Sequence, residues 1–137
     1  MSEKLHRILF VCIGNSCRSQ MAEGFARAYG QDVILPASAG LSPAISVARD
    51  TIRAMDEKNI DLRQHFPKNL RQLSGVPFDL VVNMSGYDLP LDSTVPIRDW
   101  DVPDPIGTKF EAHCEIRDRI EKLVMDLILE LRRPKHS

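Results

Sequence analysis

The sequence predicts an α/β fold in which an open parallel sheet of about four strands carries helices on both faces. Short apolar, β-branched runs alternate along the chain with longer helix-like segments, as in sheets built from strand-helix-strand units. The last long segment repeats apolar residues every three or four positions, which gives a helix one core-facing stripe. A chain of 137 residues with 43% apolar content suffices for one core, so we expect residues 1–137 to form a single domain.

The elements follow in order from these patterns. We expect strands at 7–12, 33–38 and 78–84, with a further one near 95–99, and helices near 19–29, 47–58 and 108–132. The stripe of the last helix consists of Ile116, Ile120, Leu123, Leu127 and Leu131. Residues 134–137 have the composition of a loose tail, and no internal repeat or linker interrupts the chain.

The charge balance excludes several classes of partner. Lys and Arg total 18 against 19 Asp and Glu, and they are scattered, so we expect neither nucleic acid nor an anionic membrane to be a partner. No apolar run approaches the roughly 20 residues of a membrane-spanning helix, and residues 8–13 are too short for a signal peptide. We therefore expect a cytoplasmic protein whose anion site, if any, is local.

The most informative segment is the octet at residues 12–19, which lies between the first strand and the first helix. Cys12 and Arg18 are separated by five residues. A thiolate is a strong nucleophile, and a strand-to-helix turn presents backbone N–H groups and the positive helix end to anions. The guanidinium of Arg18 adds a planar fork for a tetrahedral oxyanion. The octet therefore predicts a site for a phosphate-like dianion.

The residues inside the octet suit this role. Gly14 and Asn15 tolerate left-handed backbone, which lets the loop amides converge on one point. The helix end and Arg18 favour the thiolate form of Cys12 at neutral pH, and Ser19 can donate a hydrogen bond to the sulfur. The octet lacks the lysine and second glycine of the nucleotide-binding P-loop, which disfavours nucleoside triphosphate hydrolysis.

The octet, with Gly-Asn inside it and Met21-Ala22-Glu23 after it, resembles that of the low-molecular-weight protein tyrosine phosphatases and of the arsenate reductases that share their fold. Further landmarks occur in the expected order: Ser38-Ala39-Gly40, Ile60-Asp61-Leu62 with His65, Asp79-Leu80-Val81-Val82, and Asp104-Pro105. The resemblance spans nearly the whole chain. It implies a phosphomonoesterase that acts through a cysteinyl-phosphate.

A phosphatase of this kind needs a general acid to protonate the leaving oxygen. Asp99, Asp101 and Asp104 are candidates, and the resemblance assigns the role to Asp104, the aspartate directly before proline. Cys12 would then attack phosphorus, Asp104 would protonate the leaving group and later activate water, and no cofactor is needed. Arg18 and the loop would hold the oxyanion through Ile13, Gly14, Asn15, Ser16, Cys17, Arg18 and Ser19.

The resemblance also implies supporting roles. Asn15, His65 and Glu23 would form a hydrogen-bonded brace for the loop, which Ser38 could join, while Ser19 contacts the nucleophile. Cys17 either packs behind the loop or traps an oxidised Cys12 as a reversible disulfide. Three cysteines without C-x-x-C spacing and dispersed histidines predict no metal site; the histidines are His6, His65, His113 and His136.

Two activities compete for this site. Phosphatases of the family usually place an aromatic residue after Asp-Pro, whereas Ile106-Gly107 stand here, and Gln20-Met21 look more like the arsenate reductases. Thioredoxin-coupled reductases, however, need resolving cysteines after the third strand, where this chain has Ser85. We therefore rank a phosphatase first, acting on a phosphorylated protein or small phosphoester, and a reductase of arsenate second, with an external thiol donor or Cys17. A non-catalytic phosphate binder ranks third.

The pocket walls that decide the substrate should come from three places near the octet. These are residues 41–46, residues 85–89 and Ile106. Tyr87 is a candidate for the missing aromatic surface, although the sequence favours the alternative of an exposed loop tyrosine.

Overall fold

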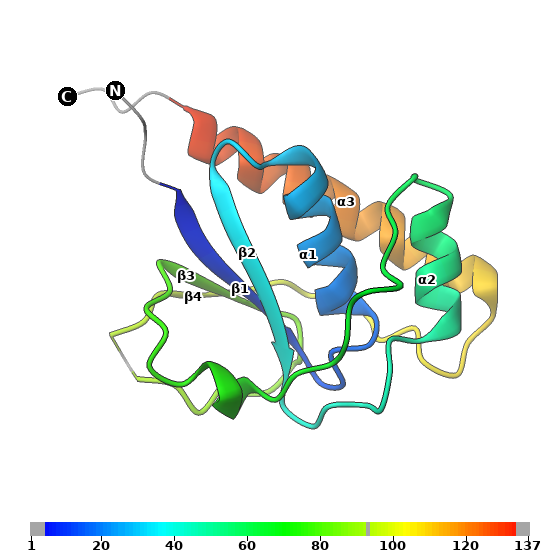
Figure 1. The fold of residues 1–137 in the computed structure, drawn as a ribbon, viewed down its shortest axis with the longest axis horizontal. Helices are drawn as coiled ribbons and strands as arrows, with labels where there is room; N and C mark the ends of the chain where they lie inside the picture. Colours follow the sequence, from blue (N-terminus) through cyan, green and yellow to red (C-terminus); the bar gives the residue numbers. More distant parts are fainter. Residues whose placement is uncertain (1–4, 93, 134–137) are drawn as a thin grey trace.

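The computed structural model describes residues 5–92 and 94–133, and it confirms an open, four-stranded parallel sheet (Figure 1). Its strand order is β2-β1-β3-β4. The strands are β1 (His6–Cys12), β2 (Ile34–Gly40), β3 (Leu80–Asn83) and β4 (Ile97–Asp99). The helices are α1 (Arg18–Tyr29), α2 (Arg49–Asp56) and α3 (Phe110–Arg132), with a single 3₁₀ turn, η1 (Leu70–Leu73).

The strand order places a ligand-binding crevice at the end of β1. The chain leaves β1 through α1 to reach β2 on one side, and later returns to β3 on the other side of β1. Ligands of open α/β sheets bind outside the carboxyl ends of the strands at such a reversal. Cys12 is the last residue of β1, paired with Gly40 of β2, while its predecessor Val11 is paired with Asn83 of β3.

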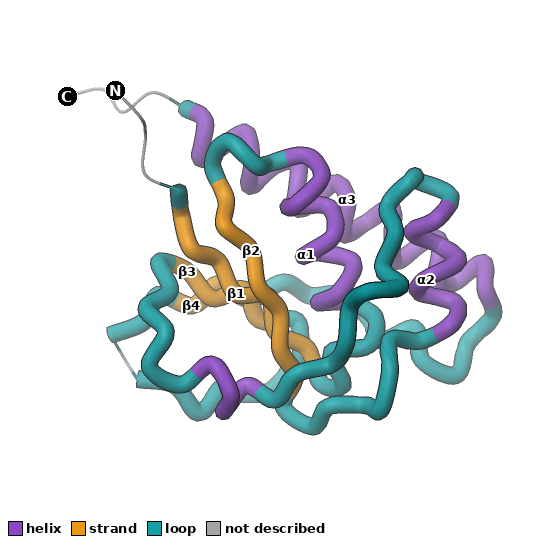
Figure 2. Tube along the Cα trace, viewed as in Figure 1, coloured by secondary structure: helices purple, strands orange, loops and turns teal. Residues whose placement is uncertain are grey.

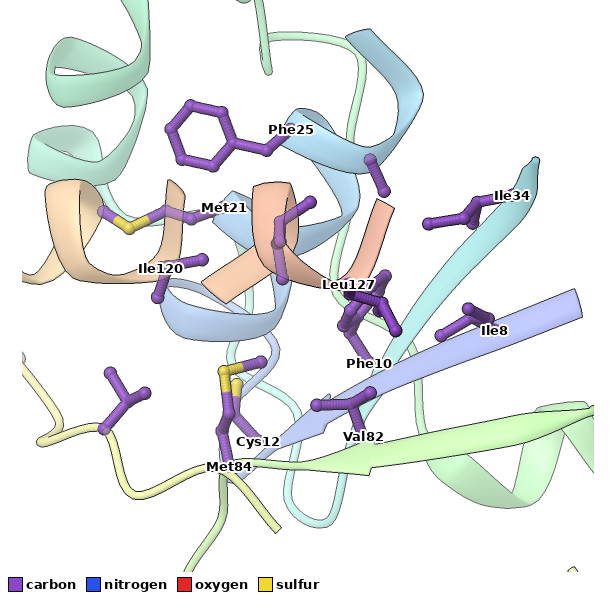
Figure 3. Packing of buried hydrophobic residues seen from close by; sticks show 14 of the residues in the cluster. Ile8, Phe10, Cys12, Met21, Phe25, Ile34, Val82, Met84, Ile120 and Leu127 are labelled. Atoms are coloured by element: carbon purple, nitrogen blue, oxygen red, sulfur yellow. The ribbon is translucent and has the colours of Figure 1, made fainter. Parts of the chain in front are cut away.

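The main core lies between one face of the sheet and the three α-helices. Phe10 of β1 is buried against Phe25 of α1 and Ile120 of α3, and Figure 3 shows Cys12 and Met84 at the edge of this cluster where the strands end. Ile120 and Leu127 of the predicted stripe are buried, and Ile116, Leu123 and Leu131 pack partly against the cluster. The long C-terminal helix therefore has the core face that its sequence predicts.

The other face of the sheet is covered by less regular structure. Leu9, Val11 and Val81 are buried there against Leu70 of η1, together with side chains from the loops before β3 and β4. The only helix on this side in the described residues is the four-residue η1 (Figure 2). The sequence did not predict it, because a segment this short has no helical period; its signal is local, a capping box formed by Asn69 and Gln72.

Several predicted bounds were too generous. The helix expected at 47–58 covers 49–56, since Ala48 is the extended N-cap and Asn59 turns the chain with φ of 60°. The strands expected at 78–84 and 95–99 shorten to 80–83 and 97–99. Directly before the second of them stands Pro96, which has no N–H for the ladder. Residues 134–137 lie outside the described part. No helix in the described residues is long and apolar enough to cross a bilayer.

Candidate active site

The loop from Cys12 to the start of α1 is held from outside by the segment that follows β2. Four of its carbonyl oxygens accept backbone N–H groups at 2.8 to 3.2 Å. The acceptor and donor pairs are Cys12 with Leu41, Ile13 with Ser42, Gly14 with Ala44, and Ser16 with Ala48. A trans peptide directs its C=O and N–H to opposite sides. The N–H groups of residues 13, 14, 15 and 17 therefore point away from this segment, as an anion-binding loop requires.

Two residues allow the backbone of the loop to curve so that its N–H groups point inward. Asn15 has φ of 51° and is the left-handed residue of the loop, whereas Gly14 does not adopt positive φ. Gly40, the last residue of β2, lies against the backbone of this loop. A Cβ at Gly40 would lie 2.6 Å from the oxygen of Ile13 and 2.9 Å from the nitrogen of Asn15. The end of β2 can thus approach the loop only because residue 40 has no side chain.

Cys12 is buried, and its sulfur lies 2.9 Å from the hydroxyl oxygen of Ser19. The amide nitrogen of Asn15 donates to that same hydroxyl oxygen at 2.7 Å. With Asn15 donating to Ser19, the hydroxyl hydrogen of Ser19 is available for the sulfur of Cys12.

Arg18 is buried with one edge of its guanidinium left for a ligand. Its Nη1 donates to the carbonyl oxygens of Met84 and Val102, the latter at 2.9 Å, in the loops that follow β3 and β4. Its Nε is buried and has no partner among the described residues, and Nη2 lies 3.6 Å from Oδ2 of Asp104. The Nε and Nη2 donors lie on one edge of the guanidinium, the arrangement with which an arginine can hold two oxygens of a tetrahedral oxyanion.

A cavity of about 240 Å³ brings Cys12, Arg18 and Asp104 together, with Ala44 and Ile106 at its walls. Asp104 is partly exposed, with Oδ1 accepting the N–H of Ile106 at 3.1 Å. Of the predicted walls, the 41–46 segment and Ile106 contribute. Gly86, Tyr87 and Asp88 line a neighbouring cavity of about 340 Å³, together with Asp99 and Asp101. Arg18 borders both cavities, and Tyr87 is exposed.

The supporting residues form two networks where the sequence predicted one brace. In the first, Gln20 links Asn15 to His65: its amide nitrogen lies 3.2 Å from both oxygens of Asn15, and His65 Nδ1 lies 2.9 Å from its amide oxygen. In the second, Ser38 donates to Glu23, which also pairs with Arg27 at 2.7 Å. The sequence did not identify Gln20 as the link between Asn15 and His65. Its polar side chain directly after Arg18-Ser19 was the one sign of such a link.

The remaining cysteines occupy different surroundings. Cys17 lines the same cavity as Cys12, and burial raises the pKa of its thiol to about 11. Cys114 lies on α3 with its sulfur 3.7 Å from Oε1 of Glu57, and burial raises its pKa as well. Across residues 5–92 and 94–133, no three His, Cys, Asp or Glu side chains converge as a metal site would require.

Comparisons with known proteins agree with this geometry. The family model of the low molecular weight phosphotyrosine protein phosphatases matches residues 7–91. The glutaredoxin arsenate reductase of Synechocystis sp. is 31% identical over 131 residues, covering 93% of this chain and 99% of that protein. A solved arsenate reductase in a phosphate-binding state superposes with a TM-score of 0.84 at 31% identity, covering 93% of this chain and 99% of its own.

A solved low-molecular-weight protein tyrosine phosphatase from T. tengcongensis has the same fold, with a TM-score of 0.77 at 29% identity over 92% of this chain and 99% of its own. The similarity thus extends to both activities that share this architecture. The chain belongs to the low-molecular-weight phosphotyrosine protein phosphatase family.

Proposed function

We propose that this protein is an arsenate reductase that converts arsenate to arsenite with electrons from an external thiol. The observation that carries the proposal is its match, along nearly the full length of both chains, to proteins named as arsenate reductases. Arsenate is a tetrahedral oxyanion like phosphate, so the free edge of Arg18 and the inward amides of the loop suit it. This reverses the order in which the sequence alone ranked the two activities.

The first step follows from the cavity. The thiolate of Cys12 attacks arsenic while Arg18 holds two of the oxygens. An S–As bond forms, an As–O bond breaks, and the leaving oxygen takes a proton from Asp104 and departs as water. Arsenic remains As(V) in this adduct, so reduction requires a second sulfur.

The chain's own cysteines are poorly suited to supply that sulfur. Behind β3, where a resolving cysteine would be useful, Ser85 donates to Asn83 Oδ1 at 2.7 Å in a compact turn. Cys114 does not line the cavity, and Cys17 has a pKa of about 11, although the attacking form of a thiol is its thiolate. An external thiolate would attack the sulfur of Cys12, and the S–As electron pair would reduce arsenic to arsenite. A second thiol would release Cys12 from the mixed disulfide.

Phosphomonoester hydrolysis is the second candidate, favoured by the position of Asp104. Its carboxylate borders the Cys12 cavity 3.6 Å from Arg18, which suits an acid that protonates an ester oxygen. A cysteinyl-phosphate would then be hydrolysed by water that the ionised Asp104 activates. The two candidates share the nucleophile and differ in what attacks the intermediate.

One experiment separates them. Wild type and Cys12→Ser are assayed in parallel for p-nitrophenyl phosphate hydrolysis and for arsenite formation with glutathione, with glutathione plus glutaredoxin, and with thioredoxin. We expect arsenite formation that requires both Cys12 and an added thiol. Cys12-dependent ester hydrolysis without any arsenite would refute the reductase and support the phosphatase, and anion binding without turnover of either would leave a binding protein.

A further inference from the structure

Gln20 is a fully buried amide in the first turn of α1, behind the oxyanion loop. Its nitrogen lies 3.2 Å from each of three oxygens: the backbone and side-chain oxygens of Asn15 and the backbone oxygen of Phe66. Its oxygen lies 2.9 Å from Nδ1 of His65. Both ends of a polar side chain in the core are therefore engaged, and one end contacts the left-handed residue of the loop.

The hydrogen-bond directions at this point are fixed by groups that can act in only one way. The backbone N–H of Lys68 donates to the side-chain oxygen of Asn15 at 2.8 Å. That contact orients the amide of Asn15 with its nitrogen toward Ser19, which in turn leaves the hydroxyl hydrogen of Ser19 for the sulfur of Cys12. The amide orientation of Asn15 thus determines whether Cys12 receives a hydrogen bond.

Gln20 is oriented by the same kind of constraint. Its nitrogen faces a carbonyl oxygen of Phe66, which can only accept, so its oxygen must face His65. His65 consequently carries a hydrogen on Nδ1. Burial lowers the pKa of His65, which favours the neutral ring with that hydrogen in place.

We propose that Gln20 is a positioning residue that clamps Asn15 against the 65–68 segment and so keeps Ser19 donating to Cys12. A left-handed asparagine persists only where its surroundings hold it. Gln20 and Lys68 supply that hold from two elements far apart in the chain, α1 and the segment before η1. The proposal concerns how hydrogen bonds hold the loop before a substrate binds, so it does not depend on which oxyanion is turned over.

The test compares Gln20→Met with Gln72→Met. Methionine has a similar length and fills the site while donating no hydrogen bond. Gln72 is an exposed glutamine that accepts the N–H of Asn69 at 2.8 Å in the capping box of η1. It makes no hydrogen bond to Asn15 in the described part of the chain, so it controls for the loss of a glutamine contact in the same region. Each variant is measured for phosphate affinity by calorimetry and for the pH midpoint of Cys12 alkylation by peptide mass spectrometry.

We expect Gln20→Met to weaken phosphate binding by about tenfold and to move the alkylation midpoint of Cys12 upward, since methionine cannot replace the hydrogen bonds that the amide makes to Asn15. Gln72→Met should change neither. A folded Gln20→Met protein with unchanged phosphate affinity and unchanged midpoint would overturn the proposal, even if it melted at a lower temperature, because the side chain would then only fill the core.

Should Gln20→Met fail to fold, His65→Ala decides the matter. This variant removes the imidazole that donates to the oxygen of Gln20, so the amide is free to rotate away from Asn15. A smaller shift of the same sign in both measurements supports the proposal, and no shift in either overturns it. Arsenite formation is measured separately: a wild type that binds phosphate but reduces no arsenate refutes the proposed function and leaves the test of Gln20 intact.

Discussion

At the scale of single residues, Asp104 differs from its acidic neighbours in what it faces. It borders the Cys12 cavity, whereas Asp101, three positions earlier, lines the neighbouring cavity. We expect Asp104→Asn to retain phosphate binding and to slow turnover by about 10²-fold or more, the usual contribution of a general acid. Asp101→Asn is the matched control, measured by steady-state kinetics on the same substrate. Equal losses of turnover in the two variants would show that Asp104 is not the general acid.

Cys17 makes a pH-dependent contribution that can be measured apart from catalysis. Burial raises the pKa of its thiol from 9.0 to about 11, so the folded chain favours the protonated form. The stability gained in this way is fully present below pH 9 and is lost as the pH rises to about 11, because the unfolded chain gives up its proton first.

The measurement is the difference in unfolding free energy between wild type and Cys17→Ala, followed by urea titration from pH 8 to pH 11. We expect this difference to shrink as the pH rises. A difference that stays constant would show that Cys17 is not held in its neutral form.

At the scale of elements, the loop depends on how closely the end of β2 approaches it. We expect Gly40→Ala to destabilise the fold by about 1–3 kcal/mol, the usual cost of overpacking, because the new methyl group would meet backbone atoms of Ile13 and Asn15. Gly14→Ala is the comparison, since a Cβ there meets nothing closer than Ser16 Oγ at 3.4 Å. Chemical denaturation of both variants checks this, and similar losses of stability would contradict it.

The long elements with a regular apolar pattern could be predicted from the sequence, and the short ones could not. The long amphipathic α3 and the apolar β1 were predictable because their periodicity extends over many residues. The 3₁₀ turn η1 was not, since four residues held by one capping box have no period. Strand ends near Pro77 and Pro96 were placed too far out for the same reason: their bounds depend on individual backbone hydrogen bonds.

At the scale of the whole molecule, the sequence located the candidate site but not all of its supports. The octet places Cys12 and Arg18 within one loop, so local spacing was sufficient to group them. The contact of Gln20 with His65 spans 45 positions and depends on how the segment before η1 folds back against α1, which no local pattern contains. The Glu23–Arg27 pair, four positions apart on α1, is within reach of helical spacing, whereas the contact of Ser38 with Glu23 joins β2 to α1 and is not.

The candidate oxyanion site connects most of the fold, so a ligand bound there should stabilise the whole folded chain. The loop contacts β2, the segment before α2 and, through Arg18, the loops after β3 and β4. A ligand bound there adds stability only to the folded state, by about 2.7 kcal/mol at 100 times its Kd. We therefore expect saturating phosphate to raise the Tm of the wild type by roughly 10 °C.

Arg18→Lys provides the control for that measurement, because a lysine lacks the paired donors of the guanidinium edge. Phosphate is compared with chloride at equal ionic strength in a thermal scan of both proteins. The Tm of Arg18→Lys should rise much less than that of the wild type, since its remaining ammonium cannot bind two oxygens side by side. Equal shifts in the two proteins would mean that phosphate acts by exclusion from the protein surface, and the oxyanion would then not be bound by Arg18.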